Sequence, residues 1–310
     1  MFLETKNSIN QEVNFSEISG KGVSVFIKRE DQLHPFISGN KFRKLKYNLK
    51  EASNQKKDTI VTFGGAFSNH IAATAAAGFL YNIKTIGVIR GDELANNLGN
   101  VLKNNPTLKF ASEHKMEFHF VTRSDYRNKE SEEFLNYLKK EFGDFYLVPE
   151  GGTNEFAVKG CEEILTNEDE QFDYICSSIG TGGTISGLIN SIKNHQKVIG
   201  FPALKGDFLK NEIKKYILRE DNWSLNTEYH FGGYAKVSEE LITFINKFKA
   251  ETNIPLDPVY TGKMMYGIID LIRKGFFKER SKILAIHTGG LQGIDGMNVL
   301  LKKKNLPQIS

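Results

Sequence analysis

Short apolar runs alternate with longer amphipathic stretches along most of the chain. Runs that are apolar on both faces are typical of strands in a parallel sheet covered by helices on both sides. Strands are predicted at 23–28, 59–63, 84–89, 117–121, 145–148, 174–178, 197–201 and 282–287. Helices are predicted at 39–49, 68–80, 94–103, 131–142, 155–165, 184–192, 207–218, 237–250 and 263–274. The alternation indicates βαβ units and an α/β fold with parallel-rich sheets flanked by helices.

The composition narrows the class of protein. A chain of 310 residues is long enough for two domains, and 40% hydrophobic residues are typical of a soluble globular protein. A net charge of +4, from 41 basic and 37 acidic residues, favours neither nucleic acid nor an anionic membrane as a partner. No apolar run approaches the roughly 20 residues of a membrane span, and Met1–Lys6 lacks the apolar core of a signal peptide. We therefore expect a cytoplasmic protein, with Cys161 and Cys176 as buried thiols and no metal site.

One lysine lies at an unusual place. Ser38 is a good N-cap, so Lys41 would fall in the first turn of a helix, where the macrodipole disfavours a cation. That field, together with any burial, would lower the pKa of the amine, and a neutral amine can attack a carbonyl to form an imine. Taken alone, the position fits a solvated surface lysine better, so the loops elsewhere in the chain must decide.

The glycine-rich segment from Gly180 to Thr184 follows a predicted strand and opens a predicted helix. Its backbone N–H groups, the helix N-terminus and two threonine hydroxyls make a credible phosphate site. A Walker A loop would need a lysine after Gly183, and a dinucleotide-binding loop would need glycine at Ile185 and an acidic residue after the next strand. The segment therefore fits a lone phosphate, with an ordinary βα turn as the alternative.

Three further loops contain polar residues at predicted strand ends: 67–70, 256–263 and 286–290. Ser68 or Asn69 also fits a simple N-cap, and Tyr260 also fits a half-buried tyrosine with a bonded hydroxyl. Ligands of open α/β sheets bind outside the carboxyl ends of the strands. A shared site therefore explains all four loops better than four independent turns do.

The lysine motif, residues 28–31 followed by 39–45, resembles that of fold-type II enzymes that use pyridoxal 5′-phosphate (PLP). More narrowly, the chain is similar to the branch that contains D-cysteine desulfhydrase and 1-aminocyclopropane-1-carboxylate (ACC) deaminase, over most of its length. The resemblance implies a two-domain fold like that of the tryptophan synthase β chain, with PLP in the cleft between the domains. We expect a small inserted domain at 47–148, a large domain formed by 1–46 and 149–310, and a homodimer.

The resemblance also implies roles for the candidate residues. Lys41 would hold PLP covalently and move the Cα proton, Lys44 would help to hold the phosphate, and Asn69 would bond the 3′-oxygen. The implied cofactor contacts are Lys41, Lys44, Asn69, Gly180, Thr181, Gly182, Gly183, Thr184 and Thr288. The implied substrate contacts are Ser68, Asn69, His70 and Tyr260. The implied catalytic groups are Lys41, Ser68, Tyr234 and Tyr260, with Tyr234 aligned less securely than the others.

Three positions separate the two branches. ACC deaminases carry glutamate, near the pyridine nitrogen, at the position of Thr261, leucine at that of Thr288 and glutamine at that of His70. All three residues here favour the desulfhydrase side, so we predict α,β-elimination of D-cysteine to pyruvate, ammonia and hydrogen sulfide. ACC, D-serine, β-chloro-D-alanine or an L-amino acid as substrate stays open, as does a non-catalytic PLP-binding protein.

Overall fold

The computed structural model describes Leu3 and residues 8–310, so most of the predicted leaderless N-terminus, Met1–Lys6, lies outside the described residues. The strands are β1 (Asn10–Glu12), β2 (Ser24–Lys28), β3 (Thr59–Gly65), β4 (Lys84–Arg90), β5 (Glu117–Val121), β6 (Tyr146–Val148), β7 (Tyr174–Ile179), β8 (Lys197–Pro202), β9 (Trp223–Leu225) and β10 (Lys282–Ile286). The helices are α1 (Asn40–Asn54), α2 (Asn69–Tyr81), α3 (Leu98–Asn104), α4 (Pro106–Glu113), α5 (Arg123–Arg127), α6 (Glu132–Phe142), α7 (Glu155–Cys161), α8 (Gly183–Ser191), α9 (Phe208–Lys214), α10 (Glu239–Thr252), α11 (Thr261–Arg273) and α12 (Gly293–Lys303).

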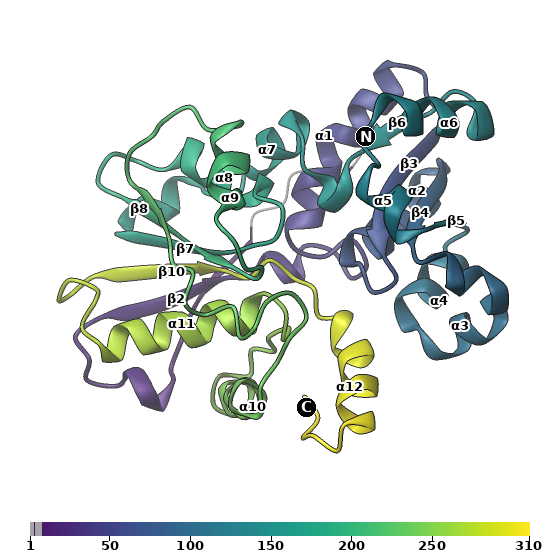
Figure 1. Ribbon diagram of the computed structural model, residues 1–310. Helices are drawn as coiled ribbons and strands as arrows, with labels where there is room; N and C mark the ends of the chain where they lie inside the picture. Colours follow the sequence, from purple (N-terminus) through teal and green to yellow (C-terminus); the bar gives the residue numbers. More distant parts are fainter. Residues whose placement is uncertain (1–2, 4–7) are drawn as a thin grey trace.

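The strands form two separate sheets (Figure 1). Within the described residues, the larger has six strands in the order β1-β2-β10-β7-β8-β9, and the smaller has four in the order β5-β4-β3-β6. All neighbouring strands are parallel except β1 and β2, which are antiparallel. The predicted α/β fold with parallel-rich sheets is confirmed.

Helices cover both faces of the larger sheet. On one face, side chains of α10, α11 and α12 pack against residues such as Ile283 and Ile199. On the other, side chains of α7, α8 and α9 pack against their neighbours Leu284 and Val198. Successive strand residues thus enter opposite apolar layers, which is why these strands read as continuous apolar runs.

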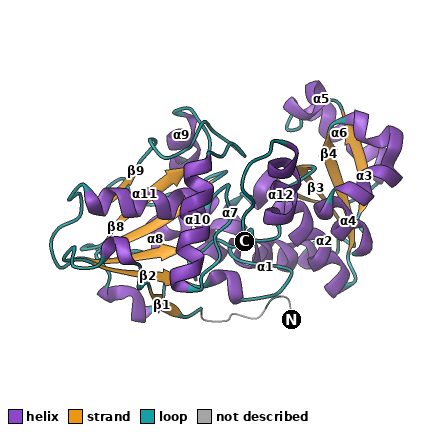
Figure 2. Ribbon diagram, turned by 90° about the horizontal axis from the view of Figure 1, so that it is seen from below, coloured by secondary structure: helices purple, strands orange, loops and turns teal. Residues whose placement is uncertain are grey.

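The smaller sheet is covered in the same way, and α1 lies between the two sheets (Figure 2). On one face Phe42, Leu45 and Leu49 of α1 pack with Ala73 and Ala77 of α2. On the other face α6 covers the sheet through a separate apolar cluster. On its far side, α1 packs closely on α7: a Cβ at Gly160 would lie 2.0 Å from the carbonyl oxygen of Arg43. Helix α1 therefore contacts both halves of the molecule, and the boundary at 46/47 stays a prediction.

Several element predictions need correction. The helix expected at 155–165 ends at Cys161, because Ile164 and Leu165 reach the core from a turn. The one expected at 94–103 is split, since Asn97 caps a new helix by accepting a hydrogen bond from Asn100. Short elements such as β1 and β9, and the helices α4, α5 and α12, were not predicted. Cys161 and Cys176 are buried thiols, as expected. No helix in the described part of the chain is both long and apolar enough to cross a membrane.

Candidate active site

A cavity of about 680 Å³ lies between the two sheets, and residues from both halves of the chain line it. Its wall contains every predicted site residue except Gly183. The other predicted residues on this wall are Lys41, Lys44, Ser68, Asn69, His70, Gly180, Thr181, Gly182, Thr184, Tyr234, Tyr260 and Thr288. The structure thus brings together segments that are up to 247 residues apart, from Lys41 to Thr288.

Lys41 is the second residue of α1, so the predicted place in the first helical turn holds. The predicted cap is wrong by one residue: Gly39 is the N-cap, with φ of 62°, and Ser38 donates a hydrogen bond to the carbonyl of Asp31 (3.1 Å). Glycine is required at position 39 for a second reason. A Cβ there would lie 2.0 Å from the carbonyl oxygen of Thr288. This close approach places the start of α1 directly against the loop after β10.

The surroundings of Lys41 lower the pKa of its amine to about 7. Burial is the largest cause, because removal from water disfavours the charged form, and the nearby ammonium group of Lys44 adds to it. At neutral pH a substantial fraction of the amine is therefore neutral. The predicted pKa shift is present, with burial and Lys44 as its causes.

Lys44 links α1 to the segment after β6, which in turn contacts the glycine-rich loop through the hydroxyls of Thr153 and Thr181 (2.5 Å). The Lys44 Nζ donates hydrogen bonds to the Gly151 carbonyl (3.1 Å) and the Thr153 hydroxyl (2.9 Å). A Cβ at Gly183 would lie 2.9 Å from that hydroxyl and 3.2 Å from Nζ, so only glycine leaves room there. Helix α8 begins at Gly183 without a side-chain cap. Its first N–H groups and a buried ammonium group therefore converge on one side of the cavity.

The smaller sheet contributes the start of α2. Ser68 is the N-cap, as one of the two sequence interpretations expected, and its hydroxyl accepts a long hydrogen bond from Ile71 (3.4 Å). His70 is buried and bonded through Nε2 to the Thr62 hydroxyl (2.8 Å). Burial, followed by Lys41 and Lys44, lowers the pKa of His70 well below its usual value, so the imidazole is neutral. Asn69 Oδ1 is buried and has no hydrogen-bond partner among the described residues.

The two threonines that separate the enzyme branches lie differently. Thr288 lines the cavity, and its hydroxyl lies 3.1 Å from that of Ser178. Thr261 is fully buried away from the cavity wall, and its hydroxyl donates to Asp257 Oδ1 (2.7 Å). Among the described residues, only one of these two positions therefore faces the site.

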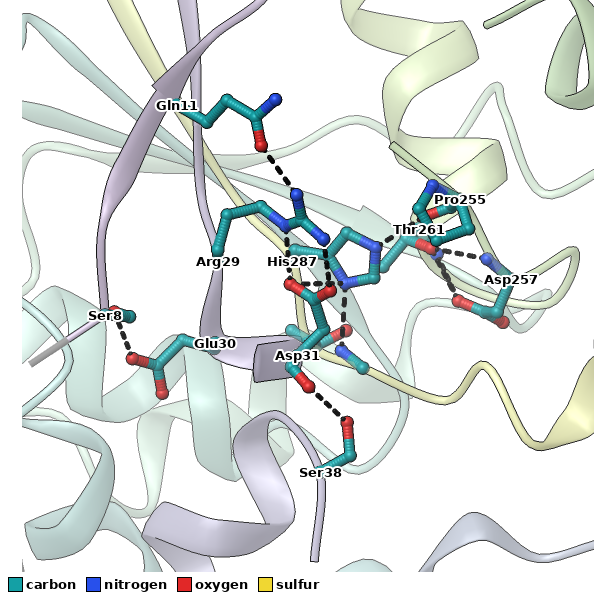
Figure 3. A network of polar contacts seen from close by, with 12 residues as sticks. Ser8, Gln11, Arg29, Glu30, Asp31, Ser38, Pro255, Asp257, Thr261 and His287 are labelled. Carbon is teal, nitrogen blue, oxygen red and sulfur yellow. Dashed lines mark hydrogen bonds and ion pairs between the residues drawn. The ribbon is translucent and has the colours of Figure 1, made fainter. Parts of the chain in front are cut away.

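The loop that carries Tyr260 is organised by one buried carboxylate (Figure 3). Asp257 accepts hydrogen bonds from the N–H groups of Val259, Tyr260 and Thr261, at 2.9, 2.9 and 2.8 Å. The sequence interpretation put this loop at a strand end, which is wrong: it joins α10 to α11. The strand-like apolar pattern arises because Ile254 and Leu256 are buried in irregular backbone.

A buried network behind the cavity joins its other walls (Figure 3). Arg29 donates two hydrogen bonds to the Asp31 carboxylate, at 2.9 and 2.7 Å, and the Asp31 carbonyl accepts the bond from Ser38. His287 Nδ1 lies 3.6 Å from Asp31 Oδ1, and its Nε2 donates to the Pro255 carbonyl (2.7 Å). The segments that carry Lys41, Thr288 and Tyr260 are thus tied together by polar contacts.

Two tyrosines lie side by side on the cavity wall. The rings of Tyr234 and Tyr260 meet edge to face, with centroids 6.2 Å apart. Burial raises the pKa of Tyr260 well above its usual value, and the neighbouring Tyr234 raises it further. Tyr234 is 46% exposed as a whole, but partial removal of its hydroxyl from water raises its pKa, although its hydrogen bond with Tyr260 opposes that shift. Both hydroxyls therefore stay protonated at neutral pH.

The residues on the wall fit PLP. The N-terminus of α8 and Lys44 suit a phosphate, the partly neutral amine of Lys41 suits an aldehyde, and the unpaired amide oxygen of Asn69 is left for a ligand. The Thr288 hydroxyl can face a ring nitrogen without requiring it to be protonated. These residues would hold the cofactor, and the reactive groups would lie on both sides of the cleft.

Sequence reasoning missed several residues that build the site. Thr153 and Ser178 are small polar residues with no distinguishing motif, and only the structure shows them bonded to Lys44 and Thr288. Asp257 did carry a signal, because Asp-Pro before a helical pattern is typical of a helix start, although α11 begins only at Thr261, with Tyr260 as its N-cap. His287 belongs to a recognised motif, but nothing in the sequence identifies Asp31 and Pro255 as its neighbours.

Comparison with known proteins identifies the family. The sequence profile of the pyridoxal-phosphate dependent enzymes matches residues 10–289. The chain belongs to this family. PLP is accordingly its cofactor, and the protein is an enzyme of the group that contains ACC deaminase and D-cysteine desulfhydrase.

Three relatives illustrate the range of named activities in this group. A putative ACC deaminase of Pyrococcus horikoshii is 34% identical, covering 88% of this chain and 86% of that protein. A bifunctional D-cysteine desulfhydrase/ACC deaminase of Arabidopsis thaliana is 32% identical, covering 88% and 74%. An ACC deaminase of Rhizobium leguminosarum bv. viciae is 30% identical, covering 91% of each chain.

Solved structures agree with the fold. The crystal structure of an ACC deaminase homologue is 32% identical and superimposes with a TM-score of 0.80, covering 97% of this chain and 94% of that one. A hydrogen sulfide-producing enzyme of Fusobacterium nucleatum has a TM-score of 0.65 at 18% identity, covering 93% and 96%. At that identity the second likeness bears on the fold alone.

Proposed function

We propose that this enzyme performs α,β-elimination on D-cysteine and releases pyruvate, ammonia and hydrogen sulfide. The observation that carries the proposal is Thr288, whose neutral hydroxyl lines the cavity beside Ser178. A neutral partner leaves a pyridine nitrogen unprotonated and the ring a moderate electron sink. Such a sink suffices when a thiolate leaves and carries charge away, whereas opening a cyclopropane demands stronger electron withdrawal.

The residues of the chain have distinct parts in this reaction. Bound PLP supplies an electron sink for the charge left on Cα when its proton departs. Lys41, whose pKa is about 7, is suited to take that proton at neutral pH. Ser68, the N-cap of α2, and the first N–H groups of that helix would bind the substrate carboxylate. The protonated hydroxyls of Tyr260 and Tyr234 are hydrogen-bond donors for the departing sulfur.

A second candidate is ACC deamination, favoured by the named activities of the relatives. One of them, the Arabidopsis thaliana protein, is named for both reactions. The lack of a carboxylate argues against ACC as the better substrate. ACC deaminases carry glutamate at the position of Thr261, whereas this chain has only the neutral hydroxyls of Thr261 and Thr288, which cannot hold a proton on the ring nitrogen as a carboxylate would.

The decisive experiment compares the two substrates on one preparation. Purified protein with PLP should release sulfide and pyruvate from D-cysteine at a kcat/KM at least about tenfold above that for 2-oxobutanoate formation from ACC. Comparable or faster turnover of ACC would contradict the assignment. A panel of D-serine, β-chloro-D-alanine and L-cysteine defines the handedness and the leaving group.

Two variants accompany this comparison. Lys41→Ala should lose the long-wavelength absorbance of covalently bound PLP and nearly all turnover, and full turnover in this variant would refute the role of Lys41. Thr288→Leu should lower sulfide release about tenfold, because the Ser178 hydroxyl loses its partner and the ring its polar neighbour. Thr288→Ser keeps the hydroxyl and is the matched control. A PLP carrier without catalysis would show the absorbance and no turnover on any substrate.

A further inference from the structure

Lys263 is a buried lysine that takes no part in the cavity wall. Its side chain is 2% exposed, on the first turn of α11. Nζ donates hydrogen bonds to the carbonyl oxygens of His230 (2.9 Å) and Gly233 (2.8 Å). Among the described residues no carboxylate lies within ion-pair distance of it. A buried ammonium group placed on two backbone carbonyls is costly and calls for a reason.

The two carbonyls belong to an unusual turn. Positive φ angles occur at Phe231 (51°), Gly232 (90°), Gly233 (113°) and Ala235 (54°), two of them at residues with a Cβ. The turn is closed internally by a hydrogen bond from Gly233 N to the His230 carbonyl (3.0 Å). The two bonds from Lys263 add to this internal bond and attach the turn to α11.

The turn and α11, which Lys263 joins, are each adjacent in sequence to one of the paired tyrosines. Tyr234 follows the bonded Gly233, and Tyr260 immediately precedes the first residue of α11. Tyr260 is fixed by the Asp257 carboxylate, whereas Tyr234 is 46% exposed and lies on the turn. The contact between the tyrosine rings therefore depends on how firmly the turn is held against the helix.

We infer that Lys263 is a positioning residue that clamps the turn His230–Gly233 to α11 and so holds Tyr234 against Tyr260. The inference deepens the proposed function, and its first test rests on that function because it measures kcat for D-cysteine. Burial lowers the pKa of Lys263 to about 8, against the effect of the Asp257 carboxylate. At neutral pH the amine is mostly charged and has three donors, more than the two carbonyls require.

The first test is a double-mutant cycle on kcat for D-cysteine with the PLP-loaded enzyme. Lys263→Met should lower kcat about tenfold or more and change PLP affinity less than about twofold, because only the tyrosine pair is displaced. In a Tyr234→Phe background the same substitution should change kcat less than about twofold. If the kcat of the double variant were instead lowered by the product of the two single losses, the two residues would act independently and the inference would be wrong. Lys263→Arg keeps the donors and should restore at least half of the wild-type kcat.

The second test does not depend on turnover. Lys236 is exposed just after the turn, so trypsin cleavage after it reports the opening of this segment. Lys263→Met should raise the cleavage rate in the native enzyme about tenfold, and Lys263→Arg should not. Tyr229→Phe, which removes a different hydrogen bond to α11 from Tyr229 to Asp270, is the control for general loosening. An unchanged cleavage rate in Lys263→Met would refute the clamp, whereas a raised rate in an enzyme inactive on D-cysteine would refute only the proposed function.

Discussion

At the scale of single residues, the site depends on what burial does to charge. Lys41 and Lys44 lie one turn apart on α1, and each has a lowered pKa, to about 7 and about 8, with burial as the first cause. The ammonium group of Lys44 adds to the shift of Lys41. One buried lysine thus helps to make its neighbour a better nucleophile, and remains available for a phosphate.

This coupling predicts a pH dependence of cofactor attachment. In cofactor-free protein, covalent attachment of pyridoxal to Lys41 should accelerate as pH rises through about 7, because the neutral amine reacts. Lys44→Met removes a nearby positive charge, so the pKa of Lys41 rises and the midpoint moves to higher pH. Pyridoxal has no phosphate, so any role of Lys44 in phosphate binding does not interfere. The rates can be followed by borohydride trapping and mass spectrometry.

The control for this experiment lies on the same helix. Lys46 is paired with Glu163 and is not among the causes of the Lys41 shift. Lys46→Met should leave the midpoint unchanged. An equal displacement in both lysine variants would mean that a general loss of positive charge, and not the nearness of Lys44, controls the amine.

At the scale of elements, the sequence predicts which loops reach the cavity better than it predicts which elements they connect and which tertiary contacts hold them. Glycine and small polar residues after apolar strands correctly place 67–70, 180–184 and 286–290 at the cavity. The last two follow β7 and β10 at one edge of the larger sheet, and the first follows β3 of the smaller sheet, on the opposite side of the cleft. The loop 256–263 also reaches the cavity, but from a helix–helix connection. An alternating apolar pattern cannot distinguish a strand from buried irregular chain, and the partners of Asp257 and His287 are set by tertiary contacts.

The start of α11 should be sensitive to one hydroxyl. Thr261→Val keeps the shape of the side chain but removes a donor to Asp257 Oδ1 and an acceptor for the Asp257 N–H. The free energy of unfolding should fall by about 1–3 kcal/mol, because buried polar groups lose their partners. Denaturant unfolding of Thr261→Val against Thr261→Ser, which keeps the hydroxyl, measures this loss. Equal stability of the two variants would show that the Asp257 network does not depend on this hydroxyl.

At the scale of the whole molecule, the site belongs to neither sheet alone. Asn69 comes from the smaller half, Gly180–Thr184 from the larger, and Lys41 from the helix between them. The two-domain arrangement was predicted only through family resemblance, because composition shows no linker. Helix α1 contributes to the core of the smaller half and also packs on α7. The sequence could not predict this, because an apolar helix face does not indicate which element will cover it.

This arrangement predicts that PLP stabilises both halves together. A ligand that binds only the folded protein, at 100 times its dissociation constant, adds about 2.7 kcal/mol of stability. Calorimetry with and without PLP should therefore show a higher melting temperature and, in the loaded enzyme, a single transition. A transition of the smaller half that does not move when PLP is added would contradict a site shared by both sheets.

The strand order of the larger sheet has a consequence for biosynthesis. Strand β2 lies between β1 and β10, so it cannot pair with its parallel neighbour until Lys282–Ile286, far later in the sequence, has been synthesised. The four strands of the smaller sheet are all complete by Val148. As the nascent chain leaves the ribosome, the inserted sheet can fold first, while the central strand of the other is still missing. The pocket around Lys41 is therefore completed only after β10 and Thr288, which follows it, have been synthesised.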